Sequence, residues 1–296
     1  MQDLLAHPAI QAAIAPFVAA LVVALLCWRM GEVAAGLAII SGFILTVVLT
    51  TGLALQPLTS TRKIILVSLC LPLLLPLIAF VRDKLSLTSQ RWGVFIGLIV
   101  PTALLVAAIS WVVWPVFSRQ EIAEAWPMLA RVMVYVAAIG LAFLAMTRLK
   151  SSEKAVAQGA SVFALGLGTA VTSMIAASAL YAQLAFSIVA AVGCLLLISL
   201  FKTPSSEVKN GVGYLGSFGL FAAVVPLALI GAAATVYAKL PGWGLLCLAV
   251  VPLFAVWPTV KISQPWLRLV ATSLLALLPV IPAVWFAWDA ASAISY

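Results

Sequence analysis

Apolar residues in this sequence gather into ten stretches, each about twenty residues long, separated by short polar segments. No Asp, Glu, Lys or Arg lies near the middle of any stretch. A bilayer core about 30 Å thick needs about 20 helical residues to cross, and lipid offers no partner to open backbone groups. The pattern therefore predicts an all-α, polytopic transmembrane helical bundle of about ten spans. The predicted spans are 9–28, 33–54, 64–81, 93–114, 127–147, 155–177, 180–201, 211–238, 243–260 and 266–288.

The sixth and seventh spans form one uncharged run, residues 155–201. As a single helix rising about 1.5 Å per residue, this run would be about 70 Å long, which is too long for one crossing. The chain is therefore predicted to fold back between Ser178 and Gln183. Composition agrees with a membrane protein, because 65% of residues are hydrophobic and 8% are charged. Soluble domains contain about a quarter charged residues.

All ten tryptophans lie at or near predicted span ends, as an interfacial aromatic belt requires. Lys and Arg divide unequally between the two sides of the predicted bundle. The larger set is Arg29, Arg82, Lys84, Arg91, Arg148, Lys150, Lys154, Lys202, Lys209, Lys261 and Arg268, and the smaller set is Arg62, Lys63, Arg119, Arg131 and Lys239. The positive-inside rule makes the larger set cytoplasmic. We therefore expect a multi-pass protein of a bacterial cytoplasmic membrane with both termini outside.

The net charge of +8 follows mainly from this orientation signal. The predicted loops are short, and none carries a basic cluster dense enough to contact several phosphates of a nucleic acid. We therefore expect the lipid bilayer as a partner and no nucleic acid.

An internal repeat is a hypothesis that the span ends suggest. Trp114 and Trp257 are each followed by proline, and each next span opens with proline and then Arg131 or Arg268. A unit of five spans has odd parity, so its second copy would be inverted in the membrane. Trp and Pro also gather at span ends without any repeat, which is the alternative explanation. In the 5+5 hypothesis the two halves of the single membrane domain are residues 1–150 and 151–296.

Ionisable side chains that could perform chemistry inside the membrane are lacking in this pattern. The single histidine, His7, precedes the first span, and all eight acidic residues lie at or beyond span ends. A Ser–His site, a metal site and a buried proton-relay carboxylate are therefore not expected. We predict no enzyme activity, no cofactor and no metal ion. The alternative, an enzyme acting on lipid, needs its acidic residues and His7 to converge at one surface, for example His7 with Asp289 and Glu121 on the outer side.

Arg131 and Arg268 are the charges closest to the membrane interior, each about one helical turn inside its span. Such side chains commonly extend to the headgroups as interfacial anchors. The functional alternative is that each arginine contacts an anion at one mouth of a pathway.

Small and hydroxyl side chains are densest in the sixth span, and the seventh carries a further polar stripe. Thr169, Thr172 and Ser173 lie close together on the sixth, and Gln183 and Tyr214 lie near the starts of the seventh and eighth. Small and polar faces commonly serve helix packing in lipid. The alternative is a polar cavity in which these five residues bind a small ligand.

Two functions remain open from the sequence. The first is a carrier or permease for a small neutral or anionic metabolite, indicated by the span number, the possible inverted repeat, the proline-kinked spans and the absence of soluble domains. The second is a non-transporting membrane subunit or an assembly or scaffold protein, which would have a membrane-protein partner and a closely packed core.

Overall fold

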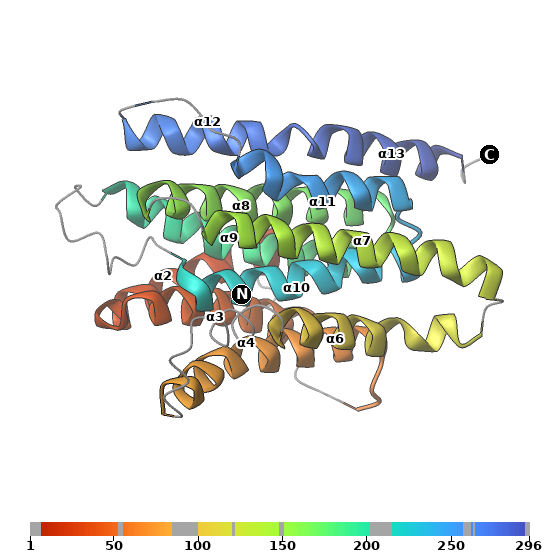
Figure 1. Cartoon of the computed structure of the whole chain (residues 1–296), viewed down its shortest axis with the longest axis horizontal. Helices are drawn as coiled ribbons and strands as arrows, with labels where there is room; N and C mark the ends of the chain where they lie inside the picture. Colours follow the sequence, from red (N-terminus) through yellow and green to blue (C-terminus); the bar gives the residue numbers. More distant parts are fainter. Residues whose placement is uncertain are drawn as a thin grey trace.

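The structure is a computed structural model that describes residues 7–52, 56–84, 100–119, 122–147, 151–201, 215–256, 262 and 264–293. All regular secondary structure within these residues is helical, as predicted (Figure 1). The elements are η1 (Ile10–Ile14), α2 (Ala15–Leu26), η2 (Trp28–Met30), α3 (Glu32–Thr50), α4 (Ser60–Lys84), α6 (Val100–Phe117), α7 (Ile122–Thr147), α8 (Ser151–Ile175), α9 (Ala179–Phe201), α10 (Gly216–Tyr237), α11 (Gly242–Val256), α12 (Pro265–Leu277) and α13 (Val280–Ser292).

Six helical segments among the described residues are long and apolar enough to cross a membrane. They are Val33–Thr50, Ala125–Phe143, Lys154–Ile175, Ala179–Leu200, Gly216–Tyr237 and Trp266–Ser292. These segments make the chain a multi-pass integral membrane protein whose surface contacts the lipid bilayer. Three further apolar helices are shorter, at Ile10–Leu26, Ala103–Phe117 and Gly242–Val256. A total of ten crossings therefore stays a prediction.

The long apolar run folds back as predicted, slightly earlier in the chain than expected. α8 ends at Ile175 and α9 begins at Ala179. The Ser178 N–H donates to the Ser173 carbonyl at 3.0 Å, and the Ala177 N–H donates to the Met174 carbonyl at 3.2 Å. This pair of bonds is a Schellman motif, which satisfies the last carbonyls of α8 without a glycine.

The last predicted span is interrupted. α12 and α13 follow one another in a line across the top of Figure 1 and separate at Leu278 and Pro279. Pro279 has no N–H, so the Leu275 carbonyl lacks its regular helical donor. The Leu278 N–H donates to this carbonyl instead, at 3.1 Å. Pro279 therefore separates two helices within this predicted span, and this break is called the joint at Pro279.

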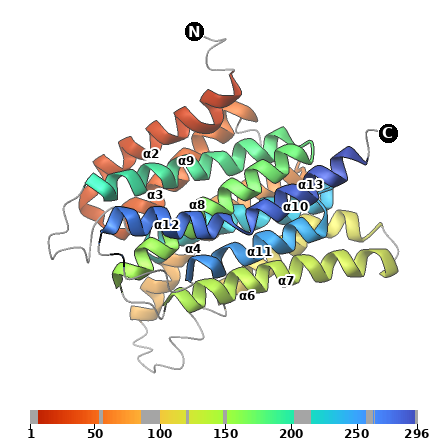
Figure 2. The same ribbon diagram turned by 90° about the horizontal axis from the view of Figure 1, so that it is seen from above.

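α10 lies at the centre of the bundle. Within its span, 89% of the residues are buried, and it packs against α3, α4, α6, α8 and α9. The α12–α13 segment lies at the periphery, along the top edge of the bundle in Figure 1 and in front of other helices in Figure 2, and 33% of the residues of its span are buried. α10 contains Ala, Gly, Val and Leu almost throughout, which permits close contact on every side.

Helix packing does not support the inverted repeat. The repeat would relate α6 to α11, α2 to α8, and α7 to the α12–α13 segment. α11 packs extensively on both α7 and α8, so the repeat would require α6 to pack to a similar extent on α12–α13 and on α2. Among the described helices α6 does neither. α9 packs on α2 and α3, so residues from both predicted halves share one core.

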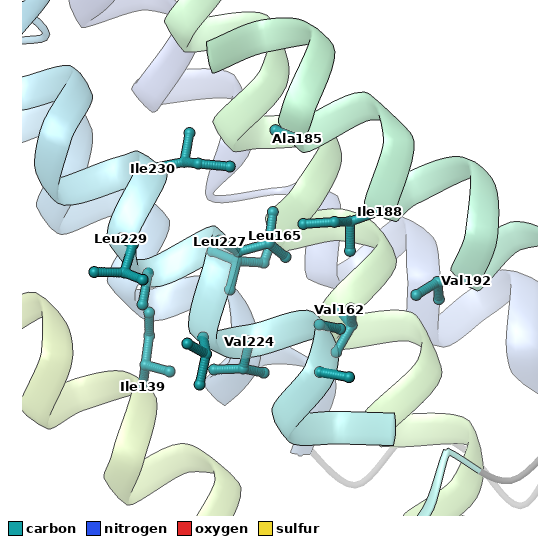
Figure 3. Close-up of a cluster of buried hydrophobic side chains, with 14 of the residues drawn as sticks. Ile139, Val162, Leu165, Ala185, Ile188, Val192, Val224, Leu227, Leu229 and Ile230 are labelled. Atoms are coloured by element: carbon teal, nitrogen blue, oxygen red, sulfur yellow. The ribbon is translucent and has the colours of Figure 1, made fainter. Parts of the chain in front are cut away.

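Five side chains in the middle of the bundle form an apolar plug, defined as Val162, Leu165, Ile188, Val224 and Leu227. They come from α8, α9 and α10, and none exceeds 7% exposure. Figure 3 shows Leu165 and Leu227 adjacent to each other, with Ile188 alongside and Val162 and Val224 in the next layer. The plug closes the space between these three helices.

Candidate functional site

A pocket of about 520 Å³ lies at one end of the bundle, where the start of α4 meets the α8–α9 turn, the α10–α11 turn and the end of α13. Alanines form much of its wall, and their short side chains leave the space open. The lining residues are Thr61, Ile175, Ala176, Ala177, Ser178, Leu180, Tyr181, Tyr237, Ala238, Lys239, Ala287, Ala290 and Ala291.

Two tyrosines and one threonine supply hydroxyl groups close together in this pocket. The Tyr181 side chain interacts with Thr61 and lies near Tyr237. The Tyr237 hydroxyl donates to the Val112 carbonyl of α6 at 2.7 Å. Residues far apart in the sequence therefore place three hydroxyls at one site.

A freed carbonyl on α6 fixes the position of α4 beside this pocket. Pro115 lies inside α6 and has no N–H, so the carbonyl of Trp111 loses its helical partner. The Lys63 Nζ donates to that carbonyl at 3.3 Å and lies 4.8 Å from the centroid of the Trp111 ring. This combined hydrogen bond and cation–π contact holds the first turn of α4, and with it Thr61, against α6.

Two pocket residues adopt backbone conformations that favour glycine. Ala177 has φ 60° and Lys239 has φ 57°, and both lie in tight turns that follow helix ends. A left-handed conformation costs an L-residue about 1–2 kcal/mol. Backbone strain of this kind is concentrated at functional sites.

Replacing Ala177 by glycine is expected to stabilise the protein by about 0.5–1 kcal/mol. Glycine removes the cost of the left-handed conformation. It also raises the conformational entropy of the unfolded chain, which offsets part of the gain in stability. The unfolding midpoint in detergent is the measurement. Ala176→Gly is the matched control, because its backbone is not left-handed. An equal shift in both variants contradicts the strain at Ala177.

Polar side chains without a hydrogen-bond partner continue from this pocket into α8. Gln158 Oε1, Thr169 Oγ1 and Ser173 Oγ are buried without a partner in strict hydrogen-bond geometry, although the Thr169 hydroxyl interacts with the Tyr135 side chain. At about 100° per residue, all three lie within about 60° of one another around α8, in line with Ala176 in the pocket wall. Buried polar groups are nearly always paired, so the free oxygens of Gln158 and Ser173 are available to hydrogen-bond a water or a ligand.

The candidate residues on α8 and α9 differ in their surroundings. Thr169, Thr172 and Ser173 are all fully buried. The Thr172 hydroxyl donates to the Gly168 carbonyl at 2.7 Å, so its hydrogen bond is made within α8. Gln183 on α9 is half-buried and does not line the pocket. Tyr214 lies outside the described residues.

The two candidate arginines lie at opposite ends of the bundle. Arg131 lies near the start of α11, where its guanidinium is 5.8 Å from the centroid of the Trp243 ring. Arg268 lies in the first turn of α12, at the end away from the α13 terminus that lines the pocket, and its Nη2 donates to the Ile262 carbonyl at 2.8 Å. Neither arginine lines the pocket. Both contacts suit interfacial anchors, and an anion-binding role stays a prediction.

The sequence did not single out several residues of this site: Thr61, Tyr181, Tyr237, Lys239 and Gln158. Tyr135 was also missed: it is completely buried, close to Thr169, and its hydroxyl donates to the Leu227 carbonyl at 3.5 Å. A Tyr or Lys at a span end resembles an ordinary interfacial residue, so only Gln158 and Tyr135, as polar groups inside spans, offered a recognisable signal.

No group of three or more His, Cys, Asp or Glu side chains that could hold a metal occurs among the described residues. No protein-family model matches the chain, and no curated protein matches it. The interpretation of the site therefore depends on its geometry and chemistry.

Proposed function

We propose that this protein is a membrane carrier or permease for a small solute. One observation supports the proposal most strongly: the pocket at the bundle end is followed along α8 by buried, unpartnered polar side chains. Ser173 lies four residues, or about 6 Å along the helix, from Thr169, and Gln158 lies about 16 Å further. These groups span a distance comparable to much of the bilayer core.

The apolar plug gives this proposed route a closed state. Val162 and Leu165 lie on α8 between Gln158 and Thr169, and they pack with residues of α9 and α10. A solute in the pocket is therefore separated from the opposite side of the membrane. Transport requires the plug to open while the pocket closes, which is alternating access. The joint at Pro279 is a candidate for this motion, because α12 and α13 both pack on α8.

We further propose that the pocket faces the outside of a bacterial cytoplasmic membrane, together with both termini. Lys239 lines the pocket, Lys63 is two residues from Thr61, and both belong to the smaller set of basic residues. By the positive-inside rule the side with fewer basic residues is not cytoplasmic.

Uptake of small organic solutes into proteoliposomes tests the carrier function. We expect wild-type protein to accumulate at least one neutral or anionic solute above protein-free vesicles. Ala290→Cys, labelled after folding with a bulky membrane-impermeant maleimide, is expected to lose about nine-tenths of this uptake, because the label fills the pocket. Labelling from one side of the membrane only also reports which side the pocket faces.

Maleimide-treated wild-type protein is the control, since Cys27, Cys70 and Cys247 are at least partly accessible. Full uptake by labelled Ala290→Cys contradicts a route through this pocket. Absence of uptake for every solute, together with a partner that co-purifies in equal amount in mild detergent, favours the membrane subunit or scaffold instead. Such a partner has an apolar surface available on α12–α13, where Trp266, Trp285 and Trp288 are exposed.

A further inference from the structure

The lining of the pocket carries a positive charge without a matching negative one. Lys239 supplies a cation, and no acidic side chain is among the described residues that line the pocket. Asp289 lies on the same helix as the lining alanines of α13 but is exposed and outside the lining. A bound organic cation would meet Lys239 with no counter-ion, whereas an anion would be attracted to it.

Hydroxyl protons are also available for an anion. The Tyr237 proton is used by the Val112 carbonyl. Thr61 and Tyr181 interact with each other, and a hydrogen bond within this pair uses one of its two protons. The second hydroxyl of the pair lines the same pocket as Lys239, and hydrogen bonds from neutral donors to a charged acceptor are stronger than those to a neutral one.

Aliphatic side chains form the rest of the wall. Ile175, Leu180 and the alanines of α13 offer an apolar surface next to the polar group. The volume of about 520 Å³ is in the range of sites for small organic molecules. The pocket lining thus combines a cation and hydroxyl groups with apolar side chains.

From this arrangement we propose that the pocket binds a monoanionic amphiphile, a carboxylate or similar anion on a short apolar stem. Lys239 and the Thr61–Tyr181 pair hold the anionic group, and the alanine wall holds the stem. This ligand class is proposed for the same pocket as the carrier function. Transport of the anion rests on the proposed carrier function, whereas its binding does not. A free organic acid and the headgroup of an anionic lipid share this chemistry.

Isothermal titration calorimetry of the whole protein in phosphatidylcholine nanodiscs tests the inference with hexanoate as the probe. We expect saturable binding of hexanoate and none of hexylammonium, with hexan-1-ol about tenfold weaker than hexanoate. Lys239→Gly is expected to weaken hexanoate binding about tenfold. Glycine suits the φ of 57° at this position, so the charge is removed without adding backbone strain.

Three further variants complete the test. Lys239→Arg is expected to retain binding, Tyr181→Phe to weaken it several-fold, and Arg119→Gln, an exposed cation outside the pocket, to leave it unchanged. The inference is overturned if hexanoate does not bind, if hexan-1-ol binds equally well, or if Lys239→Gly binds as wild type does.

The source of the anion is distinguished by adding phosphatidylglycerol to the nanodiscs. If phosphatidylglycerol competes with hexanoate, the site binds a lipid headgroup. If it does not compete, the site binds a free organic acid. Both results support an anionic ligand. Hexanoate binding without uptake of any solute refutes the carrier and leaves the ligand class standing. Uptake of neutral solutes without hexanoate binding refutes the ligand class and leaves the carrier standing.

Discussion

Gly36→Ala is expected to lower the stability of the folded protein by about 1–3 kcal/mol, the usual cost of overpacking. A methyl group at Gly36 of α3 would overlap the ring of Phe218 on α10. Phe218 is 6% exposed and therefore has little space into which it could move. In the reverse direction, a methyl group at Gly219 would lie 3.2 Å from the Cβ of Ala35. The backbones of α3 and α10 are therefore close on both sides of this contact.

The unfolding midpoint of purified protein in detergent measures this effect. Gly193→Ala is the matched control, because its new methyl group would have only an ordinary contact with Phe163 at 3.7 Å. Both variants gain the same helix propensity, so their difference reports packing alone. Phe218→Leu in the Gly36→Ala background is expected to restore part of the loss. Equal stability of Gly36→Ala and Gly193→Ala contradicts the close approach of α3 and α10.

Ser173→Ala is expected to make the protein more stable and less active. The Ser173 hydroxyl is fully buried without a partner, and an unsatisfied group of this kind costs about 1–3 kcal/mol. Removing it should therefore stabilise the fold by about 1 kcal/mol. If Ser173 hydrogen-bonds the solute in transit, the same change should reduce uptake about tenfold.

Thr172→Val provides the comparison for this result. Thr172 is equally buried, but its hydroxyl already donates to the Gly168 carbonyl, so no gain in stability is expected. Unfolding midpoints and proteoliposome uptake are measured for both variants. A loss of stability in Ser173→Ala means that the hydroxyl has a partner in the folded protein, and unchanged uptake removes Ser173 from the route.

The helical character of this protein could be predicted because lipid imposes it. Hydrophobic length indicated the positions of the apolar helices and the fold-back within residues 155–201. Only helices and closed barrels satisfy their backbone in a bilayer, and continuous apolar runs of about 20 residues fit helices rather than the alternating strands of a barrel. The break at Pro279 was less visible. Proline is common in membrane helices, and only the surrounding packing decides whether a given proline bends or interrupts the helix.

The candidate site was less predictable than the helices. Thr172 and Ser173 are neighbours with similar side chains, yet one hydroxyl is paired and the other is not. That difference depends on rotamers and nearby carbonyls, which a sequence pattern does not contain. The pocket combines Thr61 with residues near 180, 237 and 290, and these segments meet only because of the way the helices pack.

The central position of α10 has a consequence for biosynthesis. Helices α3, α4, α6, α8 and α9 all precede α10 in the chain, and all of them pack against it. Until α10 has been synthesised, these earlier helices lack the neighbour that they share in the folded protein. Nascent chains that stop before α10 therefore lack the contact surface that unites the earlier helices, and quality-control proteases should degrade such chains faster than chains that include α10.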